Sequence, residues 1–486
     1  MSRFWLLLIL TPQFYSNFYF AVELKINAPF YKNQTIKWQK KTDYISNNHE
    51  LITSSIIGPD GTAQLSADFD QIELTEISIG KSYGLIYIDT VAKSYELFFP
   101  KDTILDSMSL KKNQIQLVFL DLAKSDINNL ILDFNLQYDY FLYGDTSKLI
   151  RMAIHDKEFQ DSLNSFKIFI SDRYQDYLIK YLHMYIRYEI ALIEQMAHQS
   201  KGDLYKTYLY HTYLKKNEIA YSNDAYMQFF NLFYKKPFKL GGDEIYEKIK
   251  FSINQYNDIN HLKNAMANSP FYSNEKLNEL IIIKGLYDNY GNLNFESEKV
   301  INMLNDVAQN SRWIKHKKIA QNCINDLSYL KKGTSTPNFT WINNKDEKEN
   351  ITDYNDRYVY VNFFSSKNYI SLKELEIIET LHQKYNVVEF ISINLDEKEK
   401  DFNQFLKEND QYSWKIGRPK NPQDIIDLHR LDHLPTYLLL EPNNKILQYP
   451  AYPPSPMYNN QSIDVTLFNL QKKLKEKHQL NIGVKD

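Results

Sequence analysis

The sequence predicts a multidomain protein with an N-terminal antiparallel β-sandwich, a central α-helical region and a C-terminal α/β domain. A chain of 486 residues is too long to form a single hydrophobic core. Near Asp126 the spacing of apolar residues changes from every second residue to every third or fourth, which marks the end of the β region. Strand and helix patterns then alternate from residue 332 onward, as they do in α/β domains.

Residues 1–21 have the features of an export signal. Arg3 provides a basic start, and a short apolar run follows at 4–10. That run is much shorter than the roughly 20 residues that cross a bilayer, which disfavours a membrane anchor. Cleavage is predicted after Ala21, although Tyr19 stands where a small residue is preferred. We therefore expect an exported protein of the periplasm or cell envelope, with no transmembrane segment after the signal.

Residues 22–125 follow a β pattern. Apolar and polar side chains alternate at 24–27, as in a half-buried strand. The pair Asp60-Gly61 stands between two apolar runs and predicts a β-hairpin. Further strands are expected at 72–79, 85–88, 94–99 and 114–119. Several short strands at regular spacing predict a small antiparallel sandwich, and no catalytic motif lies in it.

Residues 126–331 follow a helical pattern. Asp126 is the expected N-cap of the first helix, because the apolar residues that follow it recur at helical spacing. Further helices are predicted at 159–170, 177–196, 224–233, 243–253, 274–287, 296–307 and 314–330. No repeat of about 34 residues recurs, so an irregular helical array is expected rather than tetratricopeptide repeats.

Residues 332–486 form the predicted α/β domain. Gly333 and Pro337 end the last helix, and the chain then returns to a β pattern. Strands are predicted at 358–364, 387–395 and 434–440, and helices at 372–385, 399–409 and 465–475. Strands that alternate with helices in this way imply a sheet with helices on both faces.

Five short motifs stand in order along this domain. They are Gly-Thr-Ser-Thr-Pro-Asn-Phe at 333–339, Tyr-Val-Asn-Phe-Phe at 360–364, Ile-Ser-Ile-Asn-Leu-Asp at 391–396, Leu434-Pro435-Thr436, and Glu-Pro-Asn-Asn-Lys-Ile at 441–446. In this order they resemble the thioredoxin superfamily, and within it the exported, multidomain TlpA/ResA-like proteins of Bacteroidota. The resemblance implies a thioredoxin-like fold with a cis-proline at Pro435.

The loop that carries the redox pair in that family has no cysteine here. The resemblance places Asn368 and Ser371 at the two cysteine positions, and Glu374 at an acidic position that often follows them. Disulfide exchange needs one thiolate to attack and a second thiol to resolve the mixed disulfide. The chain contains one cysteine, Cys323, in the helical region, where its apolar neighbours favour a buried structural role.

Composition and motifs exclude several other classes. The net charge is −3 with no long basic run, which argues against a nucleic-acid-binding protein. No phosphate-binding loop, nucleophile elbow or Ser/His/Asp set is recognisable, so we expect no catalytic residues, no cofactor and no metal.

The sequence therefore favours a redox-inactive thioredoxin-like protein that binds a protein or peptide, as a scaffold or adaptor. The resemblance implies a peptide groove beside Leu434, Pro435 and Thr436, where an extended partner segment would pair with the backbone. Two alternatives stay open. One is a thiol-disulfide oxidoreductase that uses Cys323 or an external thiol, and the other is a binding module centred on the helical region.

Overall fold

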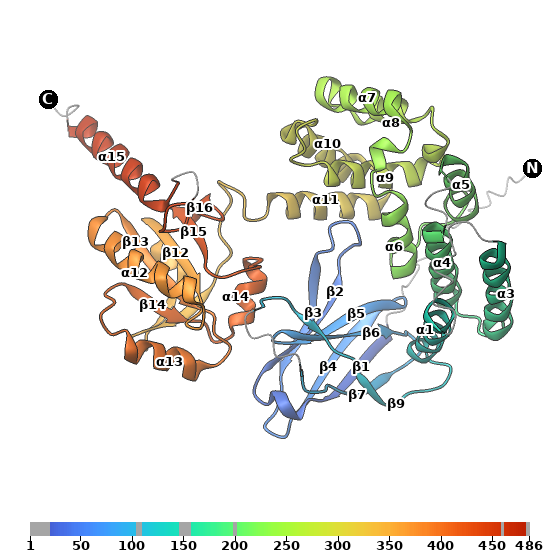
Figure 1. Ribbon diagram of the computed structural model, residues 1–486, viewed down its shortest axis with the longest axis horizontal. Helices are drawn as coiled ribbons and strands as arrows, with labels where there is room; N and C mark the ends of the chain where they lie inside the picture. Colours follow the sequence, from blue (N-terminus) through green and yellow to red (C-terminus); the bar gives the residue numbers. More distant parts are fainter. Residues whose placement is uncertain (1–19, 104–108, 145–156, 198–201, 458–460, 483–486) are drawn as a thin grey trace, which may run out of the picture.

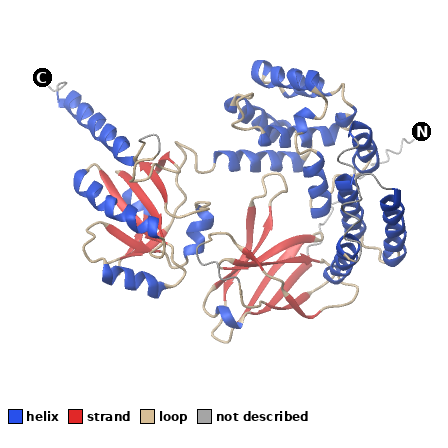
Figure 2. Ribbon diagram, in the orientation of Figure 1, coloured by secondary structure: helices blue, strands red, loops and turns tan. Residues whose placement is uncertain are grey.

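The computed structural model describes residues 20–103, 109–144, 157–197, 202–457 and 461–482. Most of the predicted signal segment 1–21 lies outside these residues. Three units are visible: a β domain, a helical domain and a C-terminal α/β domain (Figure 1). Strands gather in the first and third units, and helices fill the second (Figure 2). For the three units we propose the boundaries 22–125, 126–331 and 332–486.

The β domain is a sandwich of two sheets around one core. One sheet has the order β4 (Thr62–Phe69), β1 (Phe20–Asn27), β7 (Ser94–Phe98), β9 (Val118–Asp121). The other has the order β3 (His49–Ile56), β2 (Thr35–Lys41), β5 (Glu73–Ile79), β6 (Ser82–Ile88), β8 (Asn113–Gln114). Inward side chains such as Leu24, Trp38 and Ile77 form the core. The predicted sandwich is confirmed; most pairs are antiparallel, and β1–β7 and β6–β8 are parallel.

The predicted hairpin around Asp60-Gly61 is wrong. The turn is present, but it leads from β3 in one sheet to β4 in the other. The carbonyl of Gly61 accepts a hydrogen bond from the amide of Ala28 at 2.7 Å, just after β1. A Cβ atom at Gly61 would lie 2.7 Å from the Cα of Pro29. The close approach of these two segments directs β4 onto β1 instead of onto β3.

The helical domain is an irregular array around one large core. Its helices are α1 (Ile127–Tyr143), α3 (Lys157–Tyr174), α4 (Lys180–Ala197), α5 (Gly202–Leu209), α6 (Asp224–Phe233), α7 (Asp243–Phe251), α8 (Ile259–Met266), α9 (Glu275–Asp288), α10 (Ser297–Asn310) and α11 (Ile314–Ser328). Asp126 caps α1 as predicted, accepting a hydrogen bond from the amide of Asn128. Residues 277–286 of α9 are all buried, so α9 is the central helix of the array.

The C-terminal domain is built on one seven-stranded sheet. Its order is β11 (Lys348–Asn350), β10 (Thr340–Asn343), β14 (Lys415–Arg418), β13 (Val388–Asn394), β12 (Tyr358–Phe364), β15 (Thr436–Glu441), β16 (Lys445–Gln448). The central strand β12 is parallel to β13 and antiparallel to β15. Side chains of α12 (Tyr369–Lys384), α13 (Glu399–Glu408) and α15 (Ile463–Ile482) share a core with one face of the sheet, and α14 (Pro422–Leu428) packs on the other.

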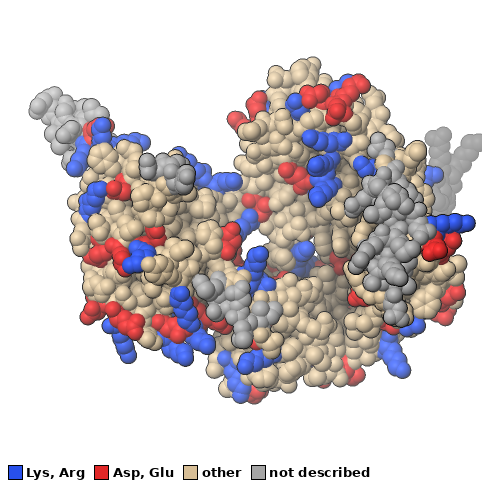
Figure 3. All heavy atoms as spheres, viewed as in Figure 1, with Lys and Arg blue, Asp and Glu red and all other residues tan. Residues whose placement is uncertain are grey.

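The C-terminal domain contacts both other domains through α14 and the residues that follow it. Lys37 and Lys112 of the β domain pair with Asp424 and Asp427 of α14 at 2.5 and 3.2 Å. Arg430 donates to Asp326 of α11 at 2.6 Å. Figure 3 shows a hollow in the middle of one face of the molecule, between the three units. Within the described residues, no helix has the length and apolar character needed to cross a membrane.

Candidate functional site

The loop between β12 and α12 is held by the N-cap of the helix. Asn368 is that N-cap, and its Oδ1 accepts a hydrogen bond from the amide of Ser371 at 3.0 Å. Asparagine is among the preferred N-cap residues because its side chain satisfies an amide that has no partner within the helix. Asn368, which the resemblance assigns to the first cysteine position, therefore has a structural role at the start of α12.

Asn368 also joins the two predicted parts of the site. Its Nδ2 donates to the carbonyl oxygen of Leu434 at 3.1 Å. The peptide bond between Leu434 and Pro435 is cis. Leu434 and Pro435 are half-buried, whereas Thr436 is buried and pairs with Phe363 as the first residue of β15. The structure thus brings Asn368, Leu434 and Pro435 together at the surface and places Thr436 inside the sheet.

Ser371 lies below this surface. Its side chain is fully buried, and its Oγ accepts a 3.5 Å hydrogen bond from the amide of Ser365. An amide at position 368 and a buried hydroxyl at 371 offer no thiolate, so the pair cannot carry out disulfide exchange.

Asp396 holds the part of the loop that precedes Asn368. The sequence motif that contains Asp396 did not predict this role. Asp396 accepts hydrogen bonds from Ser365 Oγ at 2.5 Å, the amide of Ser366 at 3.2 Å and Asn394 Nδ2 at 2.9 Å. Ser366 Oγ also donates to it. In the sequence, Ser365 and Ser366 indicate this contact, because they directly follow β12 and β12 pairs with β13.

The β domain covers part of this surface. Leu110 is buried and belongs to the core of the C-terminal domain, although it comes from the loop before β8. Together with Lys81 it lines a cavity of about 100 Å³ beside Asn368 and Leu434. That volume holds about three water molecules and is below the roughly 300 Å³ of a typical ligand pocket. The groove beside Leu434 is therefore narrow where the β domain meets it.

Cys323 is placed far from this loop in the fold, in α11 of the helical domain. Its side chain is fully buried in the core of that domain. Burial raises the pKa of its thiol well above the usual value, with the nearby carboxylate of Asp43 adding to the effect. The thiol therefore stays protonated and enclosed, which makes it a poor nucleophile.

Cys323 should react very slowly in the folded protein. We expect an aromatic disulfide reagent to modify it about a hundredfold more slowly in native buffer than in guanidinium chloride, because the core must open first. Absorbance of the released thiolate measures both rates. Equal rates in the two solvents would show that the thiol is accessible.

One family model and several solved structures match part of this chain. Residues 355–446 match the family model described as thioredoxin-like. The thioredoxin domain of a thiol-disulfide oxidoreductase from Bacteroides vulgatus is 20% identical, with 24% of this chain and 86% of that chain covered and a TM-score of 0.23. A thiol:disulfide interchange protein from Bacteroides sp. is 20% identical, with coverages of 24% and 80% and a TM-score of 0.23. A domain of a possible thiol-disulfide isomerase from Cytophaga hutchinsonii is 18% identical, with coverages of 31% and 99% and a TM-score of 0.25. No curated protein matches the chain.

Proposed function

Because the C-terminal domain is thioredoxin-like and lacks both cysteines, we propose that the protein acts by binding another protein or a peptide, as an exported scaffold or adaptor of the cell envelope. The observation that carries this proposal is the bond between Asn368 and Leu434. An N-cap amide stands where the attacking thiol would be, and it contacts the backbone that would receive a partner.

The surface beside this bond still offers contacts to a partner. Within the described residues, the amide N–H of Leu434 has no hydrogen-bond partner, and its carbonyl oxygen has a second lone pair. Tyr369 and Ile370, between the two former cysteine positions, are 72% and 60% exposed. These two side chains provide exposed apolar surface next to Asn368, at the start of α12. A partner segment would pair with Leu434 and cover these two side chains.

A photo-reactive benzophenone amino acid at position 369 tests the binding surface in the full chain. We expect covalent adducts of defined mass with envelope proteins, because the ring at 369 would lie inside the contact. The matched control is the same amino acid at Phe468 on α15, which is 57% exposed. Equal adduct yields from the two positions would refute a contact site at the loop.

Export is part of this proposal and has its own measurement. The basic and apolar start of the chain supports it, and the mature protein is expected in the envelope fraction with Val22 as its first residue. N-terminal sequencing of the fractionated protein tests this, and an intact start in the cytoplasmic fraction would contradict it.

The oxidoreductase alternative is tested by insulin reduction with dithiothreitol as the electron source. We expect no acceleration over the reagent alone, because the chain supplies no redox pair. Turnover that disappears in Cys323→Ser would restore the enzyme alternative.

The helical binding module is favoured by a separate observation, the cavities between the helical and β domains.

A further inference from the structure

Two adjoining cavities lie between the β domain and the helical domain. One has a volume of about 480 Å³ and the other of about 420 Å³. Both volumes fall in the range of small-molecule sites, roughly 300–1,000 Å³. They share four lining residues, namely Gln71, Tyr221, Ser222 and Lys315. Neither cavity takes part in the thioredoxin-like site.

The larger cavity has an apolar side. Its lining includes Ile72 from the β domain and Ile179, Met184 and Ile219 from the helical domain. Ile72, Ile179 and Met184 are partly buried against the core of the helical domain, and Ile219 belongs to that core. A lining of apolar side chains with a small number of polar groups is the usual composition of a site for a small molecule.

Three lysines line this cavity against a single carboxylate, that of Glu218, so its lining has a positive net charge. Lys180 is neutralised by Glu218 at 2.7 Å. Lys276 and Lys315 also line the cavity, and among the described residues neither forms an ion pair within 4 Å. The hydrogen bond from Lys180 lowers the pKa of Glu218, and the charge of Lys276 adds to this effect from a greater distance. The Nζ of Lys276 lies 5.6 Å from the ring centre of Tyr221. Two unpaired ammonium groups beside an apolar wall favour a ligand that has one anionic end.

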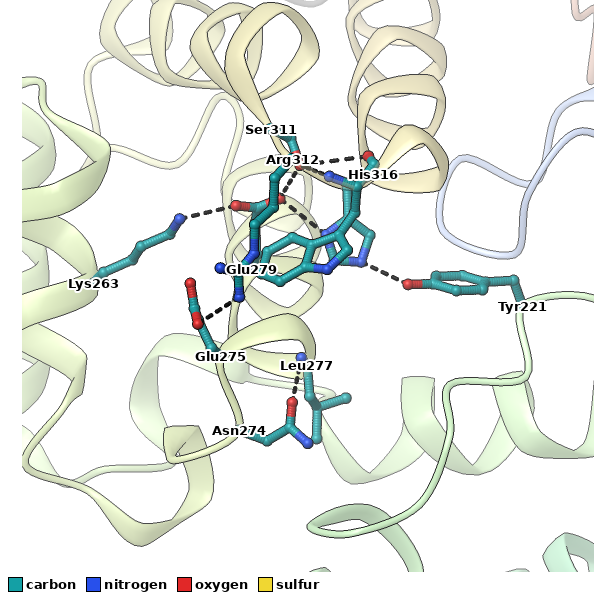
Figure 4. Close-up of polar contacts among 10 residues, drawn as sticks. Tyr221, Lys263, Asn274, Glu275, Leu277, Glu279, Ser311, Arg312 and His316 are labelled. Atoms are coloured by element: carbon teal, nitrogen blue, oxygen red, sulfur yellow. Dashed lines mark hydrogen bonds and ion pairs between the residues drawn. The ribbon is translucent and has the colours of Figure 1, made fainter. Parts of the chain in front are cut away.

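Tyr221 is held at the boundary of the two cavities by a buried hydrogen-bond chain (Figure 4). Its hydroxyl lies 2.7 Å from His316 Nε2, and His316 Nδ1 lies 2.9 Å from Glu279 Oε1. Burial raises the pKa of Glu279, but hydrogen bonds from His316, Lys263 and Ser311 outweigh it and lower the pKa to about 2.

The carboxylate is thus ionised at neutral pH. It lies within hydrogen-bond distance of His316 Nδ1, and the other ring nitrogen contacts the Tyr221 hydroxyl. The aromatic ring under Lys276 therefore has a fixed position before any ligand binds, which lowers the entropic cost of binding.

We propose that the 480 Å³ cavity binds a small organic acid, with its apolar body against Ile72, Ile179 and Met184 and its carboxylate between Lys276 and Lys315. The charge of the two lysines selects the acid, and the apolar wall selects a hydrocarbon body. This site is independent of partner binding at Tyr369, so failure of either proposal leaves the other to be judged by its own experiment.

Calorimetric titration of the full chain with octanoate tests the site. We expect saturable binding to one site, and octanamide, which lacks the charge, should bind about tenfold more weakly. Lys276→Gln and Lys315→Gln should each weaken octanoate binding about tenfold while the far-ultraviolet circular dichroism stays unchanged, because both lysines lie at the surface end of the cavity. The matched control is Lys248→Gln on α7, whose lysine pairs with Glu244 away from the cavity and should leave binding unchanged.

Three results would overturn the proposal: no saturable heat with octanoate, equal affinity for octanoate and octanamide, or unchanged affinity in both cavity variants. Two further ligands distinguish a small free acid from the C-terminus of a polypeptide as the occupant of the cavity. A short apolar peptide with a free C-terminal carboxylate is compared with its amidated form. Tighter binding of the free-carboxylate peptide than of octanoate would assign the cavity to a chain terminus and reject the small acid.

Discussion

Glu279→Gln is expected to lower the free energy of unfolding by about 3 kcal/mol. The carboxylate is 3% exposed and is bound by His316, Lys263 and Ser311, which come from α11, α8 and the segment between α10 and α11. Glutamine has nearly the same shape but no charge, so it leaves Lys263 without its counter-ion and removes one acceptor. Urea unfolding followed by circular dichroism measures the loss.

The effect of this substitution should depend on pH. The pKa of Glu279 is about 2 in the folded protein and 4.5 ordinarily, so its stabilising contribution is complete above pH 4.5 and is lost as the pH falls towards 2. The difference in unfolding free energy between the wild type and Glu279→Gln should therefore shrink between pH 5 and pH 3. Glu244→Gln, at an exposed position of α7, is the control and should change the urea midpoint very little. A pH-independent difference would show that the lost interactions do not depend on the charge of Glu279.

Asn368→Cys combined with Ser371→Cys is expected to convert the loop into a redox site. The two positions are the N-cap and the third residue of α12, so the first thiol would lie at a helix N-terminus. A drop in thiol pKa from about 8.5 to about 7 raises the thiolate fraction at pH 7 about fifteenfold. We expect a reversible intramolecular disulfide and measurable insulin reduction, where the parent chain has none.

The experiment is cleanest in a Cys323→Ser background, which leaves the two new thiols as the only ones in the chain. Mass spectrometry before and after reduction detects the disulfide. Each single cysteine variant is the matched control and should show no turnover, because it lacks the resolving thiol. Two free thiols that never oxidise would show that the loop differs in geometry from a redox loop.

Several features could be predicted from the sequence because they depend on local patterns. The apolar runs at β12 and β13, the alternating order of strands and helices, and five short motifs predicted a thioredoxin-like C-terminal domain, and residues 355–446 match the thioredoxin-like family model. Asp126 marked the first helix through its capping chemistry. The count of one cysteine was enough to exclude a redox pair, because no fold can bring together two thiols that the chain lacks.

Several elements escaped prediction, two short ones among them. Strand β14 has four residues and helix α8 has eight, too few to show a clear period in the sequence. The turn at Asp60-Gly61 was visible, but its place between two sheets depends on the contact of Gly61 with Ala28, which no local pattern reveals. The parallel pairs of the β domain are likewise set by which strands meet after folding.

The sequence alone therefore determined the fold classes and the missing chemistry, since strand period, helix period and cysteine count are local properties of the chain. The tertiary structure decided what surrounds the candidate sites. Leu110 covers part of the loop at Asn368 from another domain, and Tyr221 meets His316 from 95 positions away in the chain. Such contacts arise when segments that are distant in the chain pack together, within a domain or between domains, and their partners follow no spacing that a single sequence can show.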